Sequence, residues 1–220
     1  MFTRIPKHLI KYIVEQNYDR YTYIDQACWK FIMKISIAFL KKNADDSYLD
    51  GLKNTGITIN KIPKIKSINK KLIKFGWKAV CVRGFNPPQV FMEFQSLKIL
   101  PIAADMRNHE HITYTPSPDI VHEAAGHAPI IANKDYSNYL IKYGEIAAKA
   151  IISSEDMNLY YAIRDLSDIK ENIHATSLEI SKCEKQLKKI YNNISYVSES
   201  AMLSRMNWWT VEYGLVGNIK

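Results

Sequence analysis

The chain has 220 residues, of which 47% are hydrophobic and 24% charged, a composition typical of a folded globular protein rather than a disordered one. No apolar run reaches the roughly 20 residues that a membrane-spanning helix needs, and the N-terminal stretch, with charges inside its apolar part, does not resemble a secretion signal. Three widely spaced cysteines without a CxxC pair argue against a disulfide framework and favour a reducing, cytoplasmic location.

The hydrophobic pattern of the first half predicts helices with one short strand. A helix is predicted over residues 23–42, with Thr22 or Asp25 as its cap, followed by a turn-rich stretch around Gly51 and Gly56. The next elements predicted are a short helix over residues 65–75 that ends at Gly76, a strand over residues 78–82, and a helix that starts at Pro87 and Pro88 with its body over residues 90–100.

The second half is predicted to be helical almost throughout. Helices are expected from about Asp119, over residues 136–152 and over residues 198–215. Between them, residues 156–193 carry apolar positions spaced alternately four and three apart, which predicts a long helix or a helical hairpin. The fold class predicted is therefore mainly α with a few short strands, in a single domain over residues 1–220.

The positive charge is unevenly distributed along the chain. The formal net charge is +8, and residues 51–80 contain eight lysines and no acidic residue. Such a stretch can contact nucleic acid, but no recognisable DNA-reading or RNA-binding motif accompanies the lysines. A solvated basic surface is the favoured interpretation, so neither a nucleic-acid partner nor a membrane partner is predicted.

Two histidines, His122 and His127, stand five residues apart with Glu123 beside the first. A zinc peptidase places its histidines four apart on one helix face. On an ideal helix five residues turn about 500°, which leaves the two side chains about 140° apart. They converge only if the helix is distorted or ends between them, which Gly126 would permit. The spacing therefore argues against a zinc peptidase and for a different metal geometry.

A carboxylate from elsewhere would complete a metal site, and Glu212 is the best candidate. It is a single acid in an apolar, aromatic helical run, where a cation partner would offset its desolvation. Two histidines and one carboxylate on one side of an iron leave open positions on the other, as in ferrous enzymes that activate dioxygen. Asp119 and Glu123 are candidates to orient a ligand or a bound water, or are helix N-terminal acids favoured by the dipole.

Several motifs resemble the pterin-dependent aromatic amino acid hydroxylases, most closely their bacterial phenylalanine-hydroxylating branch. They are TPSPDIVHEAAGHAP at residues 115–129, WWTVEYGL at residues 208–215, FMEFQSLKILPIAADMR at residues 91–107 and FGWKAVCVRGFNPP at residues 75–88. The resemblance covers nearly the whole chain, and the first two motifs together are highly specific.

The resemblance implies a role for each of a small set of residues. His122, His127 and Glu212 would bind ferrous iron. The pterin would contact Phe91, Gly84 and Glu123, with Glu123 also the catalytic residue beside the metal. The amino acid would be bound by residues of one pocket, namely Arg107, Tyr114, Thr115 and Trp208. A guanidinium–carboxylate pair is a sound anchor for that substrate.

The function implied is hydroxylation of L-phenylalanine to L-tyrosine with iron(II), a tetrahydropterin and dioxygen. The alternatives are a tryptophan or tyrosine hydroxylase of the same family, or a non-catalytic iron-binding fragment. The resemblance also implies a helical insertion at about residues 155–195 and no N-terminal regulatory domain. Because family members continue well past Glu212, the sequence is expected to be incomplete at its C-terminal end.

Overall fold

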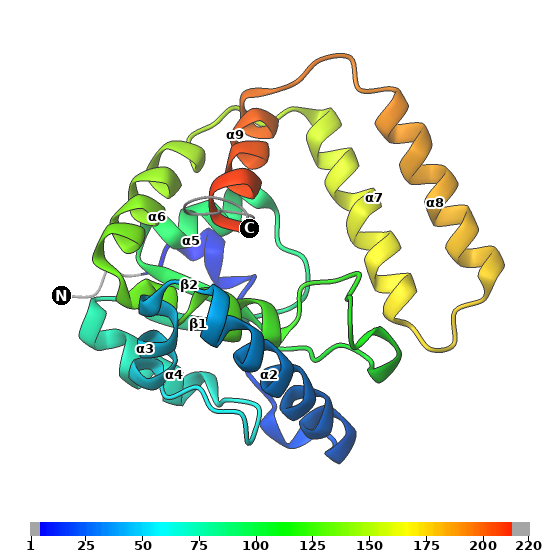
Figure 1. The fold of residues 1–220 in the computed structure, drawn as a ribbon. Coiled ribbons are helices and arrows are strands. Elements are labelled where there is room, and N and C mark those ends of the chain that lie inside the picture. The colour runs from blue at the N-terminus through cyan, green and yellow to red at the C-terminus, as the bar shows by residue number, and fades with distance from the viewer. Residues whose placement is uncertain (1–4, 213–220) are drawn as a thin grey trace.

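A computed structural model of the chain describes residues 5–212, which form a mainly helical body around a small two-stranded sheet (Figure 1). This confirms the predicted fold class. None of the described helices is both long and apolar enough to cross a lipid bilayer. In chain order the described α-helices and strands are α1 (Lys7–Ile10), α2 (Tyr23–Asn43), α3 (Asp46–Thr55), α4 (Ile65–Leu72), β1 (Lys78–Val82), α5 (Pro88–Ser96), β2 (Ile99–Ala103), α6 (Lys134–Ala147), α7 (Ser154–Glu171), α8 (Ser177–Asn192) and α9 (Glu199–Asn207).

Helix α2 begins where the sequence predicted, because Thr22 and Asp25 cap it together. The Thr22 hydroxyl accepts a hydrogen bond from the Asp25 amide at 3.2 Å, and the Asp25 carboxylate accepts one from the Thr22 amide at 2.7 Å. Two amides that an isolated helix end would leave unpaired are thus satisfied. Both predicted capping residues therefore cap the helix, each by accepting a hydrogen bond from the backbone amide of the other.

The apolar residues of α2 lie on more than one side of the helix, and only some of them pack against the core. Trp29 and Met33 are fully buried in the main core, whereas Phe31, Ile35 and Phe39 are 49%, 55% and 63% exposed. Helical periodicity identifies apolar stripes but not which stripe meets the body. Within the described residues, the stripe formed by Phe31, Ile35 and Phe39 stays exposed.

The sheet corrects the prediction for the segment after α5. The helix expected to run to residue 100 ends at Ser96, Lys98 adopts a left-handed φ of 59°, and β2 follows. All five residues of β2 are buried, and they pair in parallel with β1 from Lys78↔Ile99 to Val82↔Ala103. A short apolar run buried in a parallel sheet has no alternating pattern, so periodicity alone cannot distinguish it from helix.

Two helical glycines allow the closest approaches between elements. Gly51 lies inside α3, where a turn-rich stretch was expected, and a Cβ built on it would lie 2.0 Å from the carbonyl oxygen of Pro129. A Cβ built on Gly144 of α6 would lie 2.6 Å from the carbonyl oxygen of Met92 in α5. Neither position has room for a side chain. Gly56 and Gly76 instead end α3 and the turn after α4 in the left-handed conformation.

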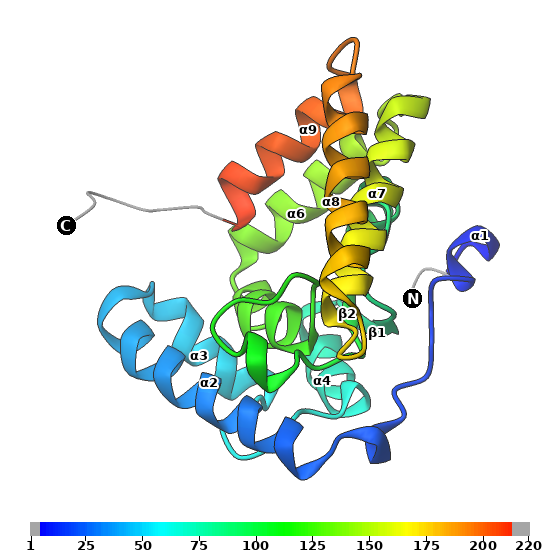
Figure 2. The same ribbon diagram turned by 90° about the vertical axis from the view of Figure 1, so that its right-hand side faces the viewer.

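Residues 156–193 form the helical hairpin α7–α8, which stands beside the body (Figures 1 and 2). The chain turns between Glu171 and Ser177, so the predicted apolar seam does not lie on one continuous helix, and Ile173 at the turn is 71% exposed. Helix α6 ends at Ala147 rather than near residue 152. Helix α9 and the turn after it fit the helix predicted over residues 198–215 as far as Glu212; the rest lies outside the described residues.

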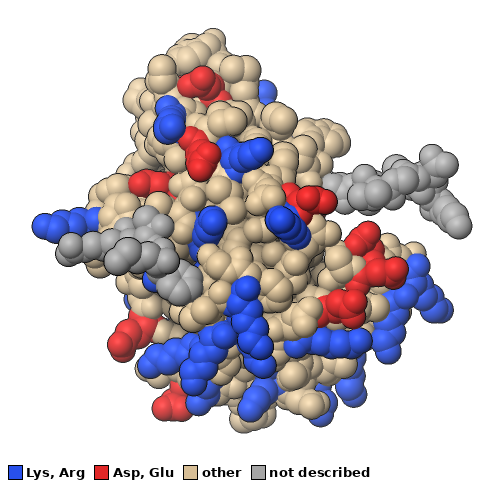
Figure 3. Space-filling view, turned by 90° about the vertical axis from the view of Figure 1, so that its left-hand side faces the viewer, with Lys and Arg blue, Asp and Glu red and all other residues tan. Residues whose placement is uncertain are grey.

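The basic stretch forms an exposed face. Figure 3 shows lysine and arginine side chains gathered on the lower part of one side of the molecule. The exposed lysines of residues 51–80 are Lys53, Lys61, Lys64, Lys66, Lys70, Lys71 and Lys74. Lys64 lies over the ring of Tyr18, with its Nζ 4.7 Å from the centroid. These lysines do not line the cleft described below.

Candidate metal centre

The two histidines converge because the helix between them is widened. Residues His122–His127 form a π-helical turn, in which the amide of Ala128 donates to the carbonyl oxygen of Glu123 at 2.9 Å. A hydrogen bond from residue i+5 to residue i brings side chains five apart close to one face. The ring centroids of His122 and His127 are 4.9 Å apart. The distortion that the spacing required is therefore a π turn.

Neighbouring elements hold this turn on several sides. The amide of Ile120 donates to the carbonyl oxygen of Asp105, just beyond β2, at 2.8 Å. The Tyr48 hydroxyl of α3 donates to the carbonyl oxygen of Ala125 at 2.8 Å. Backbone contacts of this kind fix the position of the histidines independently of any ligand. Both bonds connect segments that are far apart in the sequence.

Glu212 reaches the histidines from a second π turn, Trp208–Glu212, which continues α9. Two tyrosines of α6 hold this segment. The Tyr139 hydroxyl donates to Thr210 Oγ1 at 2.7 Å, and the Tyr143 hydroxyl donates to the carbonyl oxygen of Leu203. The two tyrosines stack on each other, with ring centroids 5.6 Å apart. Helix α6 thus sets the position from which the carboxylate approaches.

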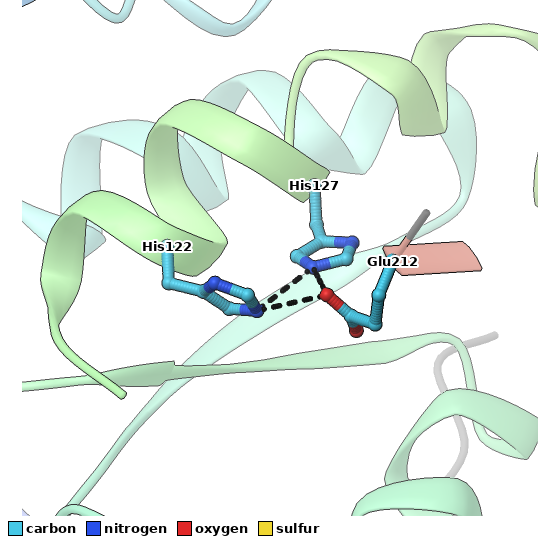
Figure 4. A group of neighbouring side chains, drawn as sticks. All are labelled: His122, His127 and Glu212. Carbon is cyan, nitrogen blue, oxygen red and sulfur yellow. Dashed lines mark hydrogen bonds and ion pairs between the residues drawn. The ribbon is translucent and has the colours of Figure 1, made fainter. Parts of the chain in front are cut away.

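Three donor atoms meet at one point (Figure 4). The Nε2 atoms of His122 and His127 are 3.2 Å apart, and Glu212 Oε2 lies 3.2 Å from the first and 3.3 Å from the second. Ligands bonded to one ion at about 2.1 Å, with about 100° between them, lie about 3.2 Å apart. The spacing of the three atoms therefore fits a single divalent cation, with the ligands gathered on one side of it.

Without a cation, the charges of this cluster favour a bound proton. Burial lowers the pKa of His122, but its hydrogen bond with Glu212 and the charges of Glu123, Glu212 and Asp119 outweigh burial and raise the pKa to about 9. Burial alone would raise the pKa of Glu212, yet hydrogen bonds from His122 and His127 hold it well below the usual carboxyl range. Protonated His122, next to the Glu212 carboxylate, thus puts a positive charge close to where a metal ion would bind.

We expect metal affinity to rise with pH for this reason. A metal ion must displace the proton from His122, whose pKa is about 9, so the apparent Kd for Co²⁺ should fall about tenfold per pH unit from pH 6.5 to 8.5. Competition titration against a chelator of known pH dependence measures this. Replacing the exposed His109 with Gln should leave the slope unchanged. An affinity independent of pH over this range would contradict the raised pKa.

Glu123 is a buried acid beside the pair. Its side chain is 5% exposed, and its Oε2 accepts a hydrogen bond from the Ala103 amide at 3.4 Å. Burial raises its pKa to about 6, although the charges of His122 and His127 act in the opposite direction. A carboxyl group with this pKa can hold or release a proton near neutral pH.

A cleft of about 500 Å³ opens beside the three donor atoms. It contains His122 and Glu212, and it is also lined by every residue predicted for the pterin and the amino acid. Those residues are Gly84, Phe91, Glu123, Arg107, Tyr114, Thr115 and Trp208. His127 lies behind this lining and is 6% exposed. The structure thus gathers around one cavity residues that the sequence separates by more than a hundred positions.

The carboxylate of Asp119, a candidate to orient a histidine ring, instead pairs with Arg107. Its Oδ2 accepts from Arg107 Nε at 2.7 Å and its Oδ1 from Arg107 Nη2 at 3.0 Å, while Oδ1 also accepts from the backbone amide of His122 at 3.3 Å. Arg107 Nη1 donates to the carbonyl oxygen of Ile112 at 3.4 Å. Of the five N–H groups on the guanidinium, two are left for a ligand. Asp119 therefore fixes Arg107 at the wall of the cleft.

Two further polar groups near the cluster have no signal in the sequence. Asn207 lines the cleft and is 6% exposed, and its Oδ1 has no hydrogen-bond partner among the described residues. The buried hydroxyl of Tyr136 is likewise unpartnered there, and burial together with the charge of Glu212 raises its pKa. Unpaired buried polar atoms are rare in folded proteins, so Asn207, which lies at the cleft wall, marks a contact for a ligand or water. No local motif pointed to either residue.

Known proteins resemble this chain in both sequence and structure. It is 30% identical over 140 residues to the phenylalanine-4-hydroxylase of Chromobacterium violaceum, covering 63% of this chain and 47% of that protein. It is 24% identical over 206 residues to the phenylalanine-4-hydroxylase of Mesorhizobium japonicum, covering 93% and 58%. A crystal structure of the Chromobacterium violaceum enzyme with bound iron(III) and 7,8-dihydrobiopterin matches with a TM-score of 0.62 and 25% identity, over 73% of this chain and 63% of that one.

One family model matches more than half of the chain. The chain spans about half the length of these curated relatives. Residues 10–156 match the model of the biopterin-dependent aromatic amino acid hydroxylases, a stretch that includes both histidines and most of the cleft lining. The chain therefore belongs to the biopterin-dependent aromatic amino acid hydroxylase family.

Proposed function

We propose that this chain binds one ferrous iron through His122, His127 and Glu212 and hydroxylates L-phenylalanine to L-tyrosine. The observation that carries the proposal is the meeting of three donor atoms, 3.2 to 3.3 Å apart, at the edge of a cleft of about 500 Å³. Two imidazoles and a carboxylate are the ligand set of ferrous enzymes that use dioxygen. Family membership supports the same assignment.

The pterin would bind next to the metal. Phe91 offers a ring for stacking, and Gly84, with a φ of 43°, brings backbone close to the same cavity. When bound, ferrous iron and tetrahydropterin together supply the activation of dioxygen. Glu123 would hold or transfer a proton at its carboxylate oxygen between these groups, as its pKa of about 6 allows.

The amino acid would be held by its carboxylate and its ring. Arg107, fixed by Asp119, offers its remaining N–H groups to the substrate carboxylate. Tyr114, Thr115 and Trp208 line the same cleft. The chain itself thus orients the substrate, excludes water and holds the ionisable groups in place. The chemistry needs no nucleic-acid or membrane partner, and the free cysteines suit a cytoplasmic location.

Product formation tests the proposal. The chain, loaded anaerobically with Fe²⁺, is given phenylalanine, a tetrahydropterin and dioxygen, and tyrosine is measured by chromatography. We expect about one iron per chain, and tyrosine only when all three additions are present. Faster turnover of tryptophan or tyrosine would instead support one of the alternative hydroxylases. Iron binding without any product would support a non-catalytic metal-binding module.

A further inference from the structure

Glu171, the last residue of α7, holds the loop that follows β2. Its Oε1 lies 3.1 Å from the Thr115 hydroxyl and 3.3 Å from His111 Nδ1, and its Oε2 lies 3.5 Å from the amide of Asn108. Three separate points of residues 108–117 therefore meet one carboxylate. Figure 1 shows the corresponding end of α7 beside this loop. Each contact joins positions at least 56 residues apart in the sequence.

The position of Glu171 within its helix indicates that these contacts stabilise the fold. A carboxylate at the C-terminal end of a helix faces the negative end of the helix dipole, which is unfavourable. The Glu171 side chain is also 23% exposed, so part of its hydration is lost. Charge-assisted hydrogen bonds to the loop offset both costs. A solvated acid on a surface helix would need no such partners.

Tyr160 makes a parallel contact from the same face of α7. Its hydroxyl donates to the carbonyl oxygen of Phe85 at 2.9 Å. Eleven residues separate Tyr160 from Glu171, and eleven residues turn about 1100°, within about 20° of three full turns. The two side chains therefore project from one face, about 16 Å apart along the axis. Ser167, buried on that face between them, completes a polar stripe.

Both loops held by α7 line the cleft. Phe85 belongs to the loop that contains Gly84, and Thr115 belongs to the loop between Arg107 and Asp119. We infer that Glu171, together with Tyr160, is a positioning residue that holds these loops in the shape required to bind the amino acid. The substrate in this inference rests on the proposed function. Nearly all of α7 lies beyond residues 10–156, the stretch matched by the family model.

Hydrogen exchange and kinetics on the iron-loaded chain test the inference. Glu171→Ala should raise amide exchange of residues 108–117 about tenfold, and it should raise the KM for phenylalanine several-fold with little change in kcat. Glu171→Gln, which keeps an acceptor oxygen, should have a smaller effect. Tyr160→Phe should loosen residues 84–88 instead. The control is Asp168→Ala, which removes an exposed carboxylate from the same helix.

The outcomes separate this inference from the proposed activity. Faster exchange in residues 108–117 supports the positioning role even if the chain makes no tyrosine. Wild-type exchange in Glu171→Ala would overturn it, whatever happens to the KM. The same loosening in Asp168→Ala would also overturn it, because the effect would then come from general weakening of α7. Iron content should remain at one per chain in every variant.

Discussion

Replacing Glu212 with Ala is expected to weaken metal binding more than about 100-fold, because groups that merely orient metal ligands already contribute 10- to 100-fold. Glu212 is one of three donors, and its Oε2 lies within 3.3 Å of both histidine Nε2 atoms. Its loss would leave two imidazole nitrogens 3.2 Å apart without the carboxylate oxygen that completes the set of three donor atoms. Isothermal titration with Co²⁺, a substitute for the oxygen-sensitive Fe²⁺, measures the change.

Two comparisons make this prediction specific. Glu212→Gln keeps the size of the side chain and one oxygen but removes the charge, so it should retain only a small part of the affinity. Glu145→Gln alters an exposed carboxylate of α6 and should bind Co²⁺ as the wild type does. Affinity within threefold of wild type in Glu212→Ala would show that the metal, if bound, is held elsewhere.

Gly51→Ala should lower the free energy of unfolding by about 3 kcal/mol or more, at the upper end of the range for overpacking a core. The new Cβ would lie 2.0 Å from the oxygen and 2.6 Å from the carbonyl carbon of Pro129, and backbone cannot rotate away as a side chain can. Helix α3 would have to move from the segment that follows His127. We therefore expect weaker metal binding as well as lower stability, measured by urea unfolding and Co²⁺ titration.

Gly126→Ala is the matched control, because it also adds one methyl group to a helical glycine. Among residues 5–212, nothing lies within 4 Å of a Cβ built at Gly126, and its φ is not in the left-handed region. Relative to glycine, alanine stabilises a helix by up to about 1 kcal/mol. Because Gly126 lies in a π turn rather than in a regular α-helix, this gain does not carry over in full, and Gly126→Ala should shift the urea midpoint much less than Gly51→Ala does. Equal urea midpoints for Gly51→Ala and wild type would contradict the close approach of α3 to Pro129.

The meeting of the three proposed metal ligands could be predicted from the sequence, because residue type and spacing pointed to it. The five-residue interval between His122 and His127 required a distorted helix, and the structure supplies a π turn. An acid among aromatic residues favoured a cation partner over a position on the solvent face, and Glu212 lies beside both histidines. In both cases a local conflict between sequence and regular structure pointed to the site.

Features that depend on tertiary packing could not be predicted. Strand β2 has no alternating pattern because every one of its residues is buried, and its first two residues fall within the helix predicted to end at residue 100. The sequence around Gly51 is typical of a turn, yet Gly51 lies inside α3, where the close approach of Pro129 leaves no room for a side chain. The contacts of Glu171 join residues far apart in the chain, and nothing around Glu171 in the sequence distinguishes it from a surface acid.

The central claim is that one divalent cation binds between His122, His127 and Glu212. X-ray absorption at the metal edge tests it most directly, on the chain loaded anaerobically with Fe²⁺ and desalted. The account predicts one iron per chain, with the scattering of two imidazole rings and the remaining ligands oxygen. A bound iron surrounded by oxygen alone, or no iron retained after desalting, would contradict it.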